Sequence, residues 1–88
     1  MTASITASMW EVVAAPGCAD ALVRWVFDEA LPDLEDPDDL VRSEVYRSSD
    51  DRVVVITWWS EEPIGLVDPP PELVAHPPQS WEFEQVTR

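Results

Sequence analysis

The sequence has no lysine and no asparagine, and it has only one cysteine and one histidine. Without lysine there is no side-chain amine for a Schiff base, which excludes a covalently held pyridoxal cofactor. The single cysteine, Cys18, excludes an internal disulfide and a thiolate cluster for zinc or iron–sulfur. We therefore expect no metal site and no cofactor.

Positive charge is also scarce. Five arginines oppose 18 acidic residues, and the formal net charge is -13. Such a field repels phosphate backbones and anionic lipid surfaces. The start of the chain lacks the pattern of a secretory signal. A membrane helix needs about 18 consecutive apolar residues, and every apolar run in this sequence is much shorter. We expect a cytoplasmic protein that binds neither nucleic acid nor membrane.

The length and the apolar content indicate one folded domain. The chain has 88 residues, of which 45% are hydrophobic and five are tryptophan, which is too apolar for a disordered acidic tail. Because Met9 directly precedes the first apolar run, residues 1–8 are predicted to be a flexible extension and residues 9–88 the domain.

The segment 52–59 is the most apolar strand candidate. Alternate side chains of a strand point to opposite faces. Here one face would carry Val53, Val55 and Trp59, and the other Val54, Ile56 and Trp58. Both faces are apolar, which predicts a central strand that is covered above and below.

Three further strands are predicted, at 9–14, 40–47 and 81–86. The first is apolar on both sides and the second is more polar, which is typical of an edge. In the last strand, Trp81 and Phe83 are expected to point inward and Glu82 and Glu84 toward water, as in a charged edge strand.

An amphipathic helix is predicted over 18–31, with Pro32 as its stop. The acidic connection 31–39 lacks the glycine and the spacing of a calcium loop, so it is interpreted as a solvated linker. In the proline-rich part 60–80, only 71–76 is predicted to be helical, with proline at its front and its back.

The predicted fold class is α+β: a ferredoxin-like split βαβ with an antiparallel four-stranded sheet in the order 4-1-3-2 and a shortened second helix. One sheet face then lacks a helix although the central strands make it apolar. We expect a homodimer through this sheet face, as in a dimeric α/β barrel. The alternative is that segment 60–80 folds across it.

The segments Trp10–Gly17, the helix with Leu22 and Trp25, the hairpin ending at Trp59, and Trp81–Glu84 resemble the antibiotic biosynthesis monooxygenase family of the dimeric α/β barrels, over residues 9–86. The resemblance implies a homodimer with a pocket between helix and sheet in each subunit. It also implies a cofactor-independent oxidation of an electron-rich aromatic substrate. The haem-degrading relatives use a set of asparagine, tryptophan and histidine. This chain has no asparagine, which disfavours haem degradation.

Several residues are candidates for binding or chemistry. His76 is a candidate general base, although its position equally suits a helix C-terminal cap. Cys18, in the first turn of the predicted helix, is a candidate nucleophile. It also lies on the apolar stripe of the helix, where cysteine behaves as a small hydrophobe. The candidate ligand-binding residues, which would contact a small aromatic molecule, are Trp25, Trp59, Tyr46 and Arg47. Trp58 and Trp59 are adjacent in a strand, so at most one of them lines a helix-side pocket.

Two functional hypotheses follow. A small-molecule binder with monooxygenase-like activity predicts a helix-side cavity of a few hundred Å³ lined by tryptophan. A non-enzymatic homodimer or protein-interaction module predicts that the tryptophans fill this space themselves.

Overall fold

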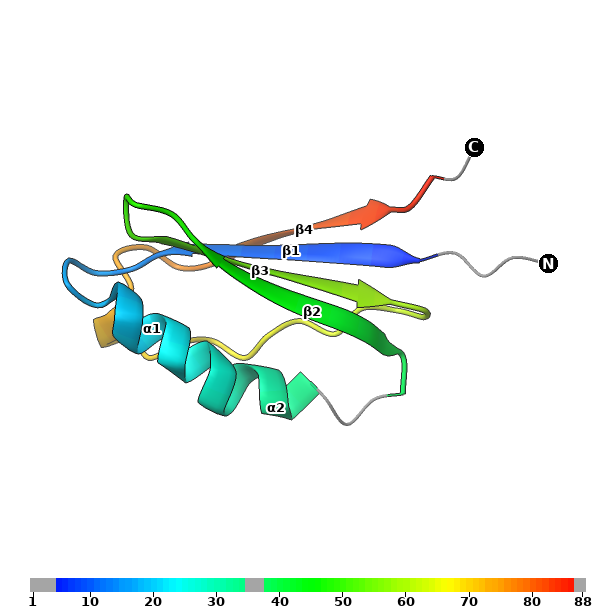
Figure 1. Cartoon of the computed structure of the whole chain (residues 1–88), viewed down its shortest axis with the longest axis horizontal. Coiled ribbons are helices and arrows are strands. Elements are labelled where there is room, and N and C mark those ends of the chain that lie inside the picture. The colour runs from blue at the N-terminus through cyan, green and yellow to red at the C-terminus, as the bar shows by residue number, and fades with distance from the viewer. Residues whose placement is uncertain (1–4, 35–37, 87–88) are drawn as a thin grey trace.

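The computed structural model describes residues 5–34 and 38–86. The elements, shown in Figure 1, are β1 (Thr6–Val13), α1 (Ala19–Trp25), the π-helical turn η1 (Val26–Ala30), α2 (Leu31–Leu34), β2 (Leu40–Arg47), β3 (Arg52–Trp59), the 3₁₀ turn η2 (Pro71–Leu73) and β4 (Gln79–Glu84). The protein is therefore an α+β domain, as its sequence predicts.

The four strands form one antiparallel sheet. Its order is β2-β3-β1-β4, and the same order read from the β4 edge is 4-1-3-2. The two strands with apolar residues on both sides, β1 and β3, lie in the centre, with Trp10 opposite Val55. A central position suits them because each of these strands then pairs with another strand along both of its edges. The apolar side chains on both of its faces pack beside those of the neighbouring strands.

β1 begins at Thr6, which is earlier than expected. Residues 6–8, predicted to lie in a flexible extension, belong to the sheet, and Ser8 is buried. The backbone of this part is paired with both β3 and β4, and just before it the carbonyl of Ile5 accepts the N–H of Gln85 at 2.8 Å. This pairing satisfies the backbone polar groups of residues 6–8. The apolar pattern, which begins at Met9, does not reveal that the strand starts earlier. Residues 1–4 of the predicted extension lie outside the described residues.

The helix does not end at Pro32, contrary to the prediction. Helical structure continues from 19 to 34 because the turn before the proline widens, and the N–H of Leu31 donates to the carbonyl of Val26, five residues back. Proline has no N–H and its ring crowds the preceding turn of an α-helix. A π turn at this point adapts the helix to the proline, so that Leu34 reaches the core. No helix in the described part of the chain is both long and apolar enough to cross a membrane.

The core lies on one face of the sheet, beneath the helix. Its buried hydrophobic residues are Trp10, Val12, Ala14, Leu22, Val26, Ala30, Leu31, Leu34, Val53, Val55 and Trp59. The segment 60–70 runs along the same side, next to the helix (Figure 1), and its Leu66 packs against this core. The alternative in which residues 60–80 cover the other face is therefore wrong.

The predicted helix at 71–76 is shorter in the structure. Only Pro71–Leu73 form a 3₁₀ turn, and Val74 is extended and pairs with Ala14. The N–H of Ala15 donates to the carbonyl of Leu73 at 2.9 Å, and the N–H of Ala75 donates to the carbonyl of Val13 at 2.8 Å. These bonds to the end of β1 replace the intrahelical bonds that a longer helix would have made.

The side chains of β4 face the opposite sides of the sheet from those predicted. Its register places Trp81 opposite Met9 and Phe83 opposite Ala7, on the face without the helix, where they are 42% and 52% exposed. The prediction that both rings point inward in the single chain is wrong, since the alternation of the strand does not say which face the helix covers. Glu82 and Glu84 lie on the helix side, and they are also exposed because α1 packs against β2 and β3.

Removing the Leu22 side chain tests the position of the core. Leu22→Ala should lower the free energy of unfolding by about 2–4 kcal/mol, because Leu22 is fully buried and a cavity would remain. Phe27→Ala, on the same helical segment, removes a larger side chain that is 55% exposed and should change stability by less than about 0.5 kcal/mol. Urea denaturation measures both, and equal losses would contradict the assignment.

Candidate functional site

The two tryptophans expected to bind a ligand both lie on the helix side. Trp59 is fully buried on β3, and Trp25 is half-buried on α1. Trp58 points to the opposite face, which settles the facing of the adjacent pair. The ring of Trp25 lies 6.5 Å from that of Trp10, at an interplanar angle of 32°. Trp25 therefore packs in an aromatic pair with a core residue.

Trp59 is held by a buried hydrogen bond. Its Nε1 donates to Oγ1 of Thr57 at 2.8 Å, and Thr57 is 1% exposed. The indole N–H, the one polar group of this side chain, is thus satisfied inside the protein. Trp59 consequently has no free donor for a ligand.

Three cavities among the described residues have volumes of about 390, 350 and 140 Å³. Neither Trp25 nor Trp59 lines any of them. The ligand-binding role of these two residues stays a prediction that none of the three cavities supports.

Tyr46 and Arg47 are on opposite faces of β2, so the structure does not bring the four candidate residues together. Tyr46 lies on the face without the helix, opposite Val54, and its hydroxyl donates to the carboxylate of Glu44. Arg47 forms an ion pair with Asp20 at the start of α1. The binding roles predicted for Tyr46 and Arg47 therefore concern two separate surfaces.

The second cavity lies where Arg47 meets the turn between β2 and β3. It is lined by Gly17, Ala19, Asp20, Arg47, Ser48, Ser49 and Asp51. In this turn, the hydrogen bond from the Ser48 hydroxyl and the charge of Arg52 hold the pKa of Asp50 below its usual value. Arg47 is already neutralised by Asp20. This cavity is therefore a weak site for an anion, because its cation has a partner and Asp51 adds negative charge.

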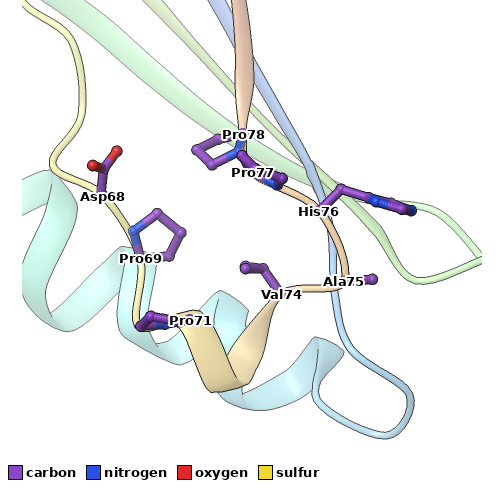
Figure 2. Close-up of a pocket in the computed structure, with 8 residues that line it drawn as sticks. All are labelled: Asp68, Pro69, Pro71, Val74, Ala75, His76, Pro77 and Pro78. Carbon is purple, nitrogen blue, oxygen red and sulfur yellow. The ribbon is translucent and has the colours of Figure 1, made fainter.

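His76 follows η2 and is exposed. It does not cap a helix, because the helical turn ends at Leu73. It contributes to the edges of the first and third cavities, but Figure 2 shows its imidazole directed away from the first cavity. Its role as a general base stays a prediction, and no candidate ligand-binding residue shares a cavity with it.

Within residues 5–34 and 38–86, no helix covers the sheet face opposite α1, which is here called the open face. By register, its apolar members are Ala7, Met9, Val13, Tyr46, Val54, Ile56, Trp58, Trp81 and Phe83. They come from all four strands. The apolar alternate residues of β1 and β3 predicted this face, whereas the contribution of Trp81 and Phe83 was missed, because only the register of β4 against β1 assigns their side.

The charges of the open face occur in pairs. Arg42 forms an ion pair with Glu44, and its guanidinium lies 4.6 Å from the centre of the Trp58 ring. Arg52 lies 3.5 Å from the carboxylate of Glu11. Each arginine thus has a neighbouring glutamate, so this face is close to neutral in a protein whose net charge is -13.

Fold and surfaces together define a small α+β protein with a four-stranded antiparallel sheet. No family model and no curated protein matches the sequence. Among solved structures, the chain is similar to the NE2512 protein of unknown function from Nitrosomonas europaea, with a TM-score of 0.73 and 13% identity over 98% of this chain and 93% of that one. It is also similar to protein SO0527 from Shewanella oneidensis, with a TM-score of 0.71 and 14% identity over 96% and 93% of the two chains. At this identity, the similarity concerns the fold alone.

Replacing Thr57 tests the buried hydrogen bond of Trp59. Thr57→Val keeps the shape of the side chain but leaves the indole N–H without an acceptor, which should lower the free energy of unfolding by about 1–3 kcal/mol. Thr6→Val is the matched control, because the same change is made at a half-buried position of β1. Chemical denaturation should show a clearly larger loss for Thr57→Val, and equal stabilities would contradict the inferred bond.

Proposed function

We propose that this chain is a homodimeric, non-enzymatic module in which the open faces of two copies pack against each other. The observation that supports this proposal is the extent of the apolar surface opposite the helix, which includes Trp58, Trp81 and Phe83. Isolated apolar residues are common on protein surfaces, but a continuous apolar sheet face is typical of an interface. A second copy of the same face is the simplest cover because a two-fold axis matches it to itself.

We further propose that the domain is ferredoxin-like and that the dimer is of the α/β-barrel type. The order strand, helix, strand, strand, short helical turn, strand supports this, as does the antiparallel pairing of β1 with both β3 and β4. The segment 60–78 takes the place that a second helix has in that arrangement. Sheet-on-sheet packing in this dimer leaves the helices on the outside.

The size of the open face suits such an interface. Four strands about 4.8 Å apart, with about eight residues each rising about 3.3 Å, span roughly 500 Å² in projection. The relief of the protruding side chains raises the accessible area above this value. A standard interface buries about 800 Å² per partner, so the face has the size of a modest but specific contact.

The charge distribution favours the same surface. Two copies with a net charge of -13 each repel one another, and the repulsion is smallest where the surface is neutral. On the open face, Arg42 and Arg52 have Glu44 and Glu11 as neighbours. This balance allows two like-charged molecules to approach face to face.

The non-enzymatic part of the proposal rests on how the helix-side aromatic residues are used. Trp59 is fully buried with its N–H satisfied, and Trp25 packs against Trp10. These side chains act as core volume, as expected for a module whose tryptophans fill the space between helix and sheet.

A lysine in the middle of the open face tests the dimer. Ile56 lies at the centre of β3, between Met9 and Glu44 on the neighbouring strands. Ile56→Lys should weaken dimerisation about tenfold or more, because the interface would bury an ammonium group without a full set of partners. Analytical ultracentrifugation over a concentration series measures the dissociation constant, and far-UV circular dichroism checks the fold.

Phe27→Lys is the control, since it makes the same change of charge at an exposed aromatic residue on the helix side. It should leave the dissociation constant unchanged within about a factor of two. A wild-type protein that sediments as a monomer at high concentration would contradict the proposal, as would equal effects of the two variants.

The response to salt gives a second test, with a definite sign. Raising the NaCl concentration to about 0.5 M shortens the Debye length to a few Å and screens the repulsion between two acidic copies. The wild-type dimer should therefore become several-fold tighter. An interface held by ion pairs between the copies would become weaker, and that result would contradict an apolar, charge-balanced interface.

A further inference from the structure

The largest of the three cavities is formed by one short stretch of the chain. It has a volume of about 390 Å³ and is lined by Asp68, Pro69, Pro71, Val74, Ala75, His76, Pro77 and Pro78. In Figure 2, Pro69 and Pro78 stand on opposite sides of the space, and Val74 points into it. A volume of this size lies in the roughly 300–1,000 Å³ range of small-molecule sites.

The walls of this cavity are rigid. Pyrrolidine rings fix the φ angle at the four proline positions of its lining and so restrict the backbone there. The chain between them is anchored, since the N–H of Leu73 donates to the carbonyl of Pro70 at 3.0 Å and Val74 pairs with Ala14 of the sheet. A ligand would not have to order this segment, which reduces the entropic cost of binding.

The polar chemistry of the cavity is one-sided. Asp68 supplies the only carboxylate among its lining residues, and the imidazole of His76 is directed away from it (Figure 2). Within residues 5–34 and 38–86, Asp68 forms no ion pair, whereas Asp20 and Asp50 have arginine partners. An exposed carboxylate thus stands beside the buried Pro69, at the boundary between water and an apolar wall.

We propose that this cavity binds a small organic cation: a primary or secondary amine that carries an aromatic or branched aliphatic group. The ammonium group pairs with Asp68, and the apolar group is buried between Pro69, Val74 and Pro78. Burial of the apolar group supplies most of the affinity. The field of a protein with a net charge of -13 attracts the cation and disfavours the corresponding anion.

This site is independent of the proposed dimer. All of its lining residues belong to one chain, and none of them is an apolar member of the open face. Loss of dimerisation therefore leaves the cavity intact, and loss of amine binding leaves the dimer intact.

Titration of the ¹⁵N-labelled full chain with 2-phenylethylamine tests the proposal by ¹H–¹⁵N correlation spectra. The amide signals of Leu73, Val74 and Ala75 should shift and saturate. Phenylacetate, which has a similar ring but the opposite charge, should shift them much less. Asp68→Asn should raise the dissociation constant of the amine about threefold to fivefold, in line with an exposed ion pair.

Asp28→Asn is the matched control, because it removes the same charge from an exposed helical residue that lines none of the three cavities. It should leave amine binding unchanged. Equal effects of the two variants would overturn the proposal and show that the amine responds only to net charge. Equal shifts with phenylacetate, or no saturable shift at Val74, would also overturn it.

Discussion

The packing of one helix against one face of the sheet is the constraint on which the rest of this structure depends. Leu22, Val26 and Leu34 bury themselves against Val53, Val55 and Trp59, and this contact defines which side of every strand is the inside. Helical structure from 19 to 34 has the length to cover part of one face only. Everything else follows from how the remaining chain meets the two faces.

On the covered face, the proline-rich segment 60–78 occupies the place of a second helix. It places Leu66, Leu73 and Val74 against the core and is fastened to the end of β1 by backbone hydrogen bonds. Proline suits this task because it holds an extended chain in place without needing a hydrogen-bond partner for its nitrogen. Prolines of the same segment line the cavity of about 390 Å³, so the segment that replaces a helix also provides the proposed amine site.

On the uncovered face, apolar side chains from four strands remain at the surface, and their two arginines are balanced by neighbouring glutamates. A hydrophobic face in a strongly acidic protein joins two opposing tendencies: burial of apolar area favours association and the net charge opposes it. In the proposed dimer, the local neutrality of the face reduces the repulsion between the two copies. The net charge therefore affects the two proposed sites in opposite ways. It opposes the association of two acidic copies, and it attracts a cation to the proposed site at Asp68.

The sequence by itself determined the element types and the apolar character of both sides of β1 and β3, because periodicity is a local property that residues such as Val53 to Ile56 carry wherever they are placed. It also excluded Schiff-base chemistry on a lysine, an internal disulfide and a cluster of thiolates. Only the tertiary structure decided the facing of Trp58 and Trp59, the outward position of Trp81 and Phe83, and the side on which segment 60–78 lies. These depend on strand register and on which face the helix covers. The continuation of the helix past Pro32 also depends on tertiary structure, since Leu31 and Leu34, on either side of the proline, are buried in the core.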